Sequence, residues 1–164
     1  MAYRFQLVQA QEVPAVFALF EACIAWMEQK GLQQWNKTGY LSFYNLDYFE
    51  SQQRQGQLYC LKNADGVIVA AAVLLRQDVR WQDRQEDPAW YVHNFVTLPT
   101  VHGAGRQLLA EAERLAASQG MRYMRLDCPV NNEALNRYYE AQGYRLAGQC
   151  TAGSYHGNRR EKIL

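Results

Sequence analysis

The sequence predicts a protein of the α/β (α+β) class, in which helices cover the faces of one mixed β-sheet. Segments typical of strands gather near both ends of the chain, and the middle alternates strand, helix, strand, helix, strand. No repeat, linker or low-complexity segment divides the chain. Its 164 residues therefore suit a single domain spanning residues 1–164, which buries roughly two thirds of its unfolded surface.

Composition narrows the class of protein further. With 49% hydrophobic and 20% charged residues, the chain has the composition of an ordinary globular protein. Seventeen basic and sixteen acidic side chains nearly cancel, so the overall charge gives no indication of binding to nucleic acid or an anionic membrane. The N-terminus lacks the features of a signal peptide, and no apolar run approaches the ~18 residues that span a bilayer. We expect a soluble, cytoplasmic protein.

The four cysteines do not form a recognisable metal site. They are widely spaced, and no CxxC pair or Cys/His cluster accompanies them. We therefore expect no metal, and small buried thiols in a reducing compartment.

The first half of the chain contains a strand, two helices and a hairpin. Residues 3–8 alternate as a strand does, and a helix opens near Pro14 and ends at Lys30-Gly31. Residues 46–54 indicate a second short helix within an aromatic-rich segment. Strands over residues 57–62 and 67–76 flank a turn at residues 63–66, whose Asp-Gly is a strong hairpin indicator. The charged residues 77–88 are expected to form a polar loop outside the core.

The central unit of the second half is a strand, a glycine-containing turn and a helix. We expect the strand over residues 89–97, the turn over 98–102 and the helix over 103–118, closed by Gly120. A strand over 122–127, a helix over 132–141 and strands over 144–149 and 159–164 follow. Pro99 and Pro129 cannot donate ladder hydrogen bonds and are expected to end the pairing of their strands.

A glycine turn that opens a helix can hold a phosphate, because free backbone N–H groups converge there. The G-x-G at Gly103-Ala104-Gly105 is weak evidence alone, since about 0.7 such matches are expected by chance with 11 glycines in 164 residues. Leu108 stands where a dinucleotide fingerprint needs its third glycine, and the Lys-Ser/Thr of a Walker loop is absent.

Two longer stretches resemble the Gcn5-related N-acetyltransferase (GNAT) superfamily. FVTLPTVHGAGRQLLAEAE carries that family's Gln/Arg-x-x-Gly-x-Gly/Ala turn, except that Thr100 takes the first position. LDCPVNNEALNRYYEAQGYR carries its C-terminal signature, through Asn132, Tyr139, Gly143 and Tyr144. The two motifs occur in the family's order with a strand between them, and the resemblance extends over nearly the whole chain.

The resemblance implies a fold, a donor and an acceptor. The fold would be a mostly antiparallel twisted sheet of about six to seven strands, the donor acetyl-CoA, and the acceptor a primary amine of a small molecule or peptide. The glycine turn would hold the pyrophosphate and the preceding strand edge would pair with the pantetheine amides. The cofactor-binding residues would be Phe95, Val96, Thr97, Leu98, His102, Gly103, Ala104, Gly105, Arg106, Gln107 and Asn132.

The resemblance also implies catalytic roles. Tyr139 matches the tyrosine that serves as general acid at the departing thiolate. Because a tyrosine pKa of about 10 exceeds a thiol pKa of ~8.5, proton transfer before C–S cleavage is uphill by roughly 2 kcal/mol. Either the sulfur becomes basic as it leaves, or Tyr139 mainly donates a stabilising hydrogen bond. A core aromatic on an apolar helix face is the alternative for Tyr139. The candidates for a base are His93, favoured by its strand position, and the loop carboxylates Asp83, Glu86 and Asp87. A structural role for His93 is the alternative.

The acceptor is not named by the sequence. The segment that commonly forms the acceptor wall in this fold contains Trp26, Trp35, Tyr40 and Tyr44, and aromatic rings there bind apolar or cationic groups. Core packing explains them equally well. Family members are often dimers, but no segment here specifies a homodimer interface.

Two other functions compete with acetyl transfer. A non-catalytic acyl-CoA-binding or regulatory protein would share this fold, since fold does not fix function. A nucleotide-binding module would use the same turn for another phosphate, although the missing lysine and glycine disfavour it.

Overall fold

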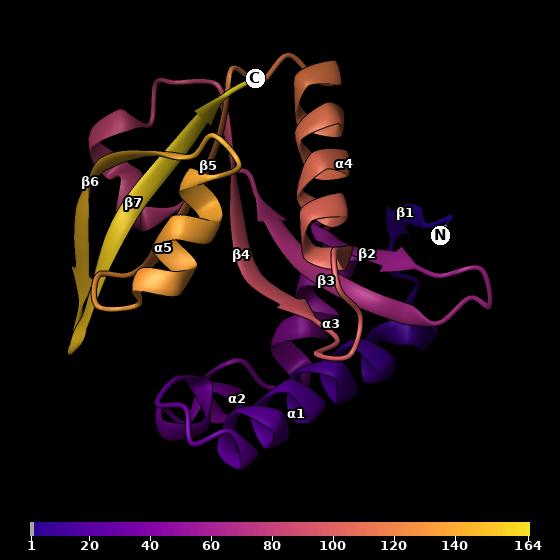
Figure 1. Cartoon of the computed structure of the whole chain (residues 1–164). Coiled ribbons are helices and arrows are strands. Elements are labelled where there is room, and N and C mark those ends of the chain that lie inside the picture. The colour runs from indigo at the N-terminus through magenta and orange to yellow at the C-terminus, as the bar shows by residue number, and fades with distance from the viewer. Residues whose placement is uncertain (1) are drawn as a thin grey trace. The chain divides into compact units, whose positions relative to one another are not determined.

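A computed structural model describes residues 2–164 and resolves them into two compact units. Unit 1 runs up to Val73 and resumes over Asn94–Leu109, and unit 2 comprises Leu74–His93 and Ala110–Leu164. Seven strands form one sheet in the order β1-β2-β3-β4-β5-β7-β6 (Figure 1). The prediction of a mixed sheet is confirmed, because β4 and β5 pair in parallel whereas β1–β2, β2–β3, β5–β7 and β6–β7 pair antiparallel. The single domain stays a prediction.

Unit 1 contains the N-terminal strands and helices. Short 3-10 turns precede α1 and α2, at Ala10–Glu12 and Trp35–Lys37. The main elements are β1 (Arg4–Leu7), α1 (Val13–Gln29), α2 (Tyr40–Phe43), α3 (Leu46–Arg54), β2 (Leu58–Lys62) and β3 (Ile68–Leu75, of which the last two residues belong to unit 2). The short helix α2 was not predicted, because four residues are too few to show a helical period.

Local chemistry explains the ends of these elements. Pro14 lies in the first turn of α1, where its missing N–H costs nothing, and Gly31 follows the helix at a positive φ of 67°. The Asn45 side chain accepts a hydrogen bond from Tyr48 N and caps α3. In the hairpin turn, the Asn63 side chain accepts from the backbone N–H groups of Asp65 and Val67, which fixes the predicted turn.

The helix that includes α1 corrects one expectation. Residues Ala10–Gln29 form a 20-residue helical stretch, and an 18-residue window within it has a mean hydropathy of 1.3, which is long and apolar enough to cross a membrane by length and composition. The expectation that no run approaches this length is therefore wrong. Val16 and Phe20 of α1 are fully buried within the protein, however, and core helices of globular proteins meet the same test.

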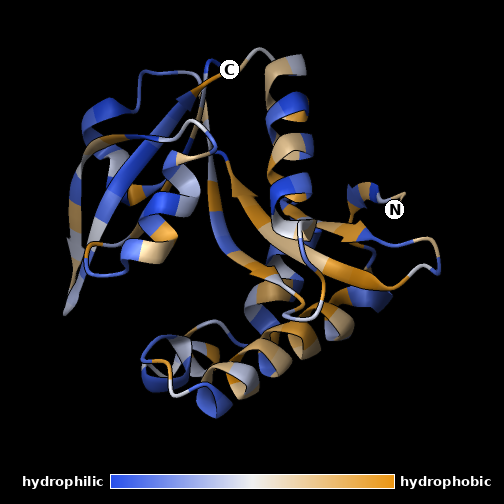
Figure 2. Ribbon diagram, viewed as in Figure 1, coloured by the Kyte–Doolittle hydropathy of each residue, from blue (hydrophilic) through white to orange (hydrophobic). Residues whose placement is uncertain are grey.

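Unit 2 contains the C-terminal strands and α5. Its elements are a 3-10 segment (Val79–Arg84), β4 (Ala89–Thr97, up to His93 in this unit), α4 (Ala104–Ser118, from Ala110), β5 (Tyr123–Pro129), α5 (Glu133–Glu140), β6 (Arg145–Ala152) and β7 (Tyr155–Ile163). Figure 2 shows that β7 is mostly hydrophilic, whereas β2 and β3 of unit 1 are hydrophobic. Strands buried on both faces read as continuous apolar runs, which explains the character of β3.

One expectation for unit 2 is confirmed and one is wrong. Pro129 ends the pairing of its strand, since it is the last residue of β5 and its pair with Gly157 is the last of the antiparallel ladder with β7. The charged segment 77–88 does contribute to the core, because the Trp81 side chain is 0% exposed and packs with Ala89 and Tyr91. A single tryptophan among charged residues shows no periodicity, so no local pattern predicts its place in the core.

Candidate functional site

The end of β4 belongs to unit 1 and leads directly into the glycine turn. Val96 is buried there, whereas Phe95 and Thr97 are half-buried. The backbone N–H of Leu98 donates to Val69 O of β3 at 2.8 Å, which attaches the last residues of the strand to its neighbour. The predicted cofactor edge thus has a fixed position relative to the turn that follows it.

The glycine turn has the geometry of an anion cradle. Val101 N donates to Leu98 O at 2.9 Å and closes the first bend, and Gly103 then takes a φ of +83° before α4 begins at Ala104. Among the residues that the structure describes, no neighbouring atom lies within 4 Å of the position that a Cβ on Gly103 would occupy, so the turn is open on that side. The first-turn N–H groups of a helix have no acceptor within the helix and attract anions.

One predicted contributor falls outside this cradle. Gln107 N donates to Gly103 O at 3.1 Å, which is the first helical hydrogen bond of α4, so its N–H is already used. The backbone N–H groups of the cradle therefore come from Gly103, Ala104, Gly105 and Arg106. The side chains of His102 and Arg106 are exposed, which suits charge-assisted contacts with a phosphate.

We expect Gly103→Ala to weaken acetyl-CoA binding about tenfold, because an alanine at positive φ costs about 1 kcal/mol or more and shifts the cradle. Gly120→Ala is the matched control: it lies beyond the other end of α4, also at φ +83° and also with nothing within 4 Å. Both variants should lose similar thermal stability, but only the first should bind acetyl-CoA more weakly in calorimetry. Equal affinities would contradict the assignment of the cradle.

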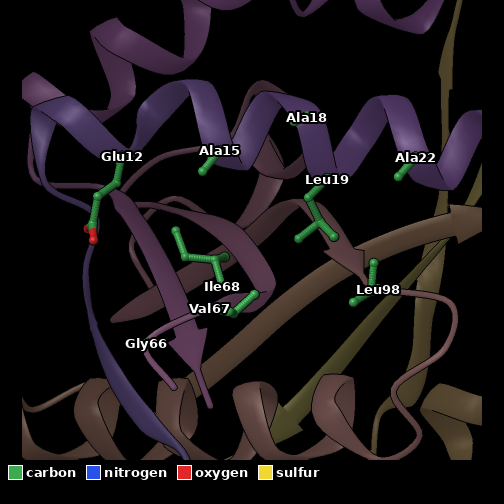
Figure 3. A pocket seen from close by; sticks show the side chains of 9 residues that line it. All are labelled: Glu12, Ala15, Ala18, Leu19, Ala22, Gly66, Val67, Ile68 and Leu98. Carbon is green, nitrogen blue, oxygen red and sulfur yellow. The ribbon is translucent and has the colours of Figure 1, made fainter. Parts of the chain in front are cut away.

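A cavity of about 390 Å³ in unit 1 lies between α1 and the β2–β3 turn and reaches Leu98 of the predicted cofactor edge (Figure 3). Three alanines of α1 and the side chains of Leu19, Val67, Ile68 and Leu98 give it an apolar lining. Its one charged residue, Glu12, is hydrogen-bonded to Lys62. An apolar lining with a carboxylate does not suit a pyrophosphate, so the size of this cavity does not make it the cofactor site.

Aromatic side chains of the predicted acceptor wall form a continuous cluster in unit 1 that extends to Tyr48. Trp35 stacks on Tyr40 with ring centroids 4.5 Å apart, Tyr44 is tilted against Tyr40 at 4.8 Å, and Tyr48 meets Tyr44 edge-on at 4.9 Å. All four rings are half-buried. Trp26 lies on α1 with 37% of its surface exposed.

The wall contains a residue that the sequence interpretation missed. Asn94 of β4 is 7% exposed and forms hydrogen bonds with two tyrosines of the wall. An amide side chain within a largely apolar strand was the available indication.

Tyr139 lies on α5 in unit 2, where it is 5% exposed and packs edge-on against Tyr144. Burial raises the pKa of Tyr139 well above its usual value, because the apolar surroundings disfavour the charged phenolate. The phenol therefore keeps its proton across the physiological range. This favours a role as hydrogen-bond donor over complete proton transfer.

Two asparagines hold α5 in place. The predicted cofactor residue Asn132 is the N-cap of α5, and its side-chain oxygen accepts from Leu135 N at 3.0 Å. Asn136, which was not predicted, is buried: its amide donates to Pro129 O and its oxygen accepts from Asn158 and Arg160. Asn136 lies one turn before Tyr139 and so fixes the helix that presents this ring.

The predicted base His93 is half-buried on β4 in unit 2. A guanidinium nitrogen of Arg80 lies 2.8 Å from His93 Nε2, and since a guanidinium only donates, Nε2 is the acceptor. Arg80 also lies 3.7 Å from a carboxylate oxygen of Asp127, whose other oxygen accepts from Tyr155 at 2.5 Å. His93 must release Arg80 before Nε2 can take a proton.

The loop carboxylates are placed differently from one another. Asp83 forms two hydrogen bonds with Arg159, which lower the pKa of Asp83 and make it a weaker base. Asp87 accepts from the buried Arg125, and Glu86 is exposed.

Comparisons with known proteins bear on the family and the fold of the chain. The model of the acetyltransferase (GNAT) family matches residues 20–144. An uncharacterised N-acetyltransferase of Bacillus subtilis, YesJ, is 23% identical over 153 residues, which are 89% of this chain and 83% of YesJ. A GNAT-family acetyltransferase of Listeria monocytogenes shares the fold with a TM-score of 0.82 at 20% identity, over 99% of this chain and 95% of its own.

The PaiA N-acetyltransferase of Thermoplasma acidophilum, solved in complex with coenzyme A, has a TM-score of 0.77 at 15% identity, with full coverage of both chains. Likeness at this identity shows the fold, and the family model covers both the turn and the Tyr139 helix. From the family match and the shared fold, we conclude that the chain belongs to the GNAT family of acetyltransferases.

Proposed function

We propose that the protein transfers an acetyl group from acetyl-CoA to a primary amine. The observation that carries the proposal is the cradle at Gly103, open on one side and directly continuous with the strand edge at Phe95, Val96, Thr97 and Leu98. The cradle fits a pyrophosphate, and the edge fits the amides of a pantetheine arm. The GNAT relative solved with coenzyme A supports the same assignment.

The protein's residues divide the work of the reaction. Acetyl-CoA supplies an activated thioester, and transfer forms a C–N bond while the C–S bond breaks. Tyr139 donates a hydrogen bond to the departing sulfur, which stabilises the charge that develops there. The amine must lose a proton, and His93 accepts it once Arg80 has moved away.

The acceptor is proposed to carry an apolar or cationic group beside its amine. The ring surfaces of Trp35 and Tyr40 are suited to either group, and Trp26 can extend the wall along α1. We also propose that the protein is cytoplasmic and that it forms a homodimer. Light scattering measures the oligomeric state directly.

Calorimetry with acetyl-CoA tests the first step. We expect binding that is saturable below millimolar concentration, and no heat would contradict the proposal. Release of free thiol is then followed with phenethylamine, spermidine, a peptide with a free N-terminus and an aminoglycoside. Acetylation of at least one amine supports the transferase.

A non-catalytic acyl-CoA-binding protein is the second candidate. Thr100 in place of Gln or Arg, and the occupied Nε2 of His93, favour it. Such a protein would bind acetyl-CoA but acetylate none of the amines. A nucleotide-binding module would instead show competition between ATP and CoA, with the stronger binding for ATP.

A further inference from the structure

The backbone of Asn94 is unusual among the residues of unit 1. Its φ is +47°, and no other non-glycine residue in the described part of the chain has a positive φ. L-residues avoid this region, and asparagine tolerates it better than most because its short amide can bond locally. Because this φ lies outside the extended range, the backbone bends locally at Asn94, immediately before the edge assigned to acyl-CoA.

The side chain of Asn94 connects this bend to the aromatic wall. Tyr48 Oη donates to Asn94 Oδ1 at 2.7 Å, and Asn94 Nδ2 donates to Tyr40 Oη at 2.7 Å. One amide thus binds two hydroxyls, from α2 and from α3. Buried amide groups of this kind are costly to leave unpaired, so the three side chains hold one another in a single arrangement.

We propose that Asn94 is a positioning residue for acetyl transfer, which fixes the acceptor wall relative to the acyl-CoA edge. Through Tyr40 and Tyr48 it sets the orientation of the rings, and through its backbone it sets the direction of Phe95 and the residues that follow. The hydroxyls are held by the amide, so the wall offers ring surface to the acceptor. The proposal rests on the proposed function, because it assumes that wall and edge bind the two substrates.

Two variants separate the side chain from the backbone. Asn94→Gly removes the amide but permits the positive φ, and Tyr40→Phe with Tyr48→Phe removes both hydroxyls but keeps Asn94 and the rings. If the glycine variant does not fold, the tyrosine variant alone tests the proposal. Tyr59→Phe is the control: it removes a hydroxyl from another buried tyrosine of unit 1, which stacks on Phe5 in a different part of the fold.

Steady-state kinetics use acetyl-CoA and whichever amine of the panel above is acetylated fastest. We expect both variants to lower kcat/KM for the amine about tenfold, mainly through KM, with the Kd of acetyl-CoA within about threefold of the wild type. Combining them should add little, because they remove the same contacts. Tyr59→Phe should match the wild type in both measurements.

Three results would overturn the positioning role. The first is an unchanged KM for the amine, and the second is a loss of kcat/KM that multiplies when the variants are combined. The third is a tenfold weaker binding of acetyl-CoA in the tyrosine variant. The last would show that the contacts only maintain the fold. If the wild type bound no acetyl-CoA, the proposed function itself would be refuted. If the wild type acetylates the amine, a contradictory result in the variants refutes only the role of Asn94.

Discussion

Tyr139→Phe is expected to lower kcat by about ten- to a thousandfold while the Kd of acetyl-CoA stays close to that of the wild type. The substitution keeps the buried ring and its edge contact with Tyr144, so the fold should persist. Only the proton or hydrogen bond offered to the departing sulfur is lost. Single-turnover measurement of thiol release, with calorimetry on the same preparation, separates the two quantities.

The neighbouring Tyr138→Phe provides the control, since it removes a hydroxyl from the same helix. It should keep kcat within about threefold of the wild type. Because burial raises the pKa of Tyr139, its ionisation should cause no loss of activity as pH rises toward 10. An unchanged kcat in Tyr139→Phe would assign the ring to the core alone.

Arg125→Leu is expected to cost about 3 kcal/mol of unfolding free energy, the lower end of the range for breaking a buried ion pair. Arg125 is 1% exposed, and its guanidinium bonds to Glu161 at 3.1 Å and to Asp87 at 2.5 Å. It also lies 4.8 Å from the centre of the Trp81 ring. Its loss leaves the Glu161 carboxylate, whose side chain is only 17% exposed, without this partner. Urea unfolding measures the change.

Two further variants check the reason for this loss. Arg114→Leu removes an exposed arginine that pairs with Glu111 one turn away, and should cost no more than about 0.5 kcal/mol. Arg125→Leu combined with Glu161→Leu should recover part of the stability, because the largely buried Glu161 carboxylate is then no longer left with only the longer 3.4 Å ion pair to Arg84. If the single variant at Arg125 were no less stable than Arg114→Leu, the buried network would not stabilise unit 2.

Sequence periodicity was a reliable guide where an element presents one buried face. The helix through Val16 and Phe20 and the strand Ala89–Thr97 have the predicted type and nearly the predicted bounds. The glycine turn was also predicted, because glycine is typical of turns. Gly103 has a φ of +83°, a conformation that residues with a side chain disfavour. These features depend on neighbours close along the chain.

Contacts between distant segments were beyond such reasoning. Trp81 lies in the core because it packs against Tyr91 of β4 and Arg125 of β5. No pattern in the neighbouring sequence indicates this. Arg80 reaches His93 Nε2 across thirteen residues, which changes what that histidine can do. Asn136 looked like an ordinary polar residue on a helix until Arg160 and Asn158 were found beside it.

The sequence alone determined the class of fold, the cradle at Gly103 and the family resemblance, because each depends on residue type and spacing within a short stretch. The tertiary structure decided the roles of the polar side chains, since a hydrogen-bond partner far along the chain cannot be inferred from periodicity. Asn94 shows the difference most clearly. In the sequence it is one amide in an apolar strand, and only folding places Tyr40 and Tyr48 at 2.7 Å from it.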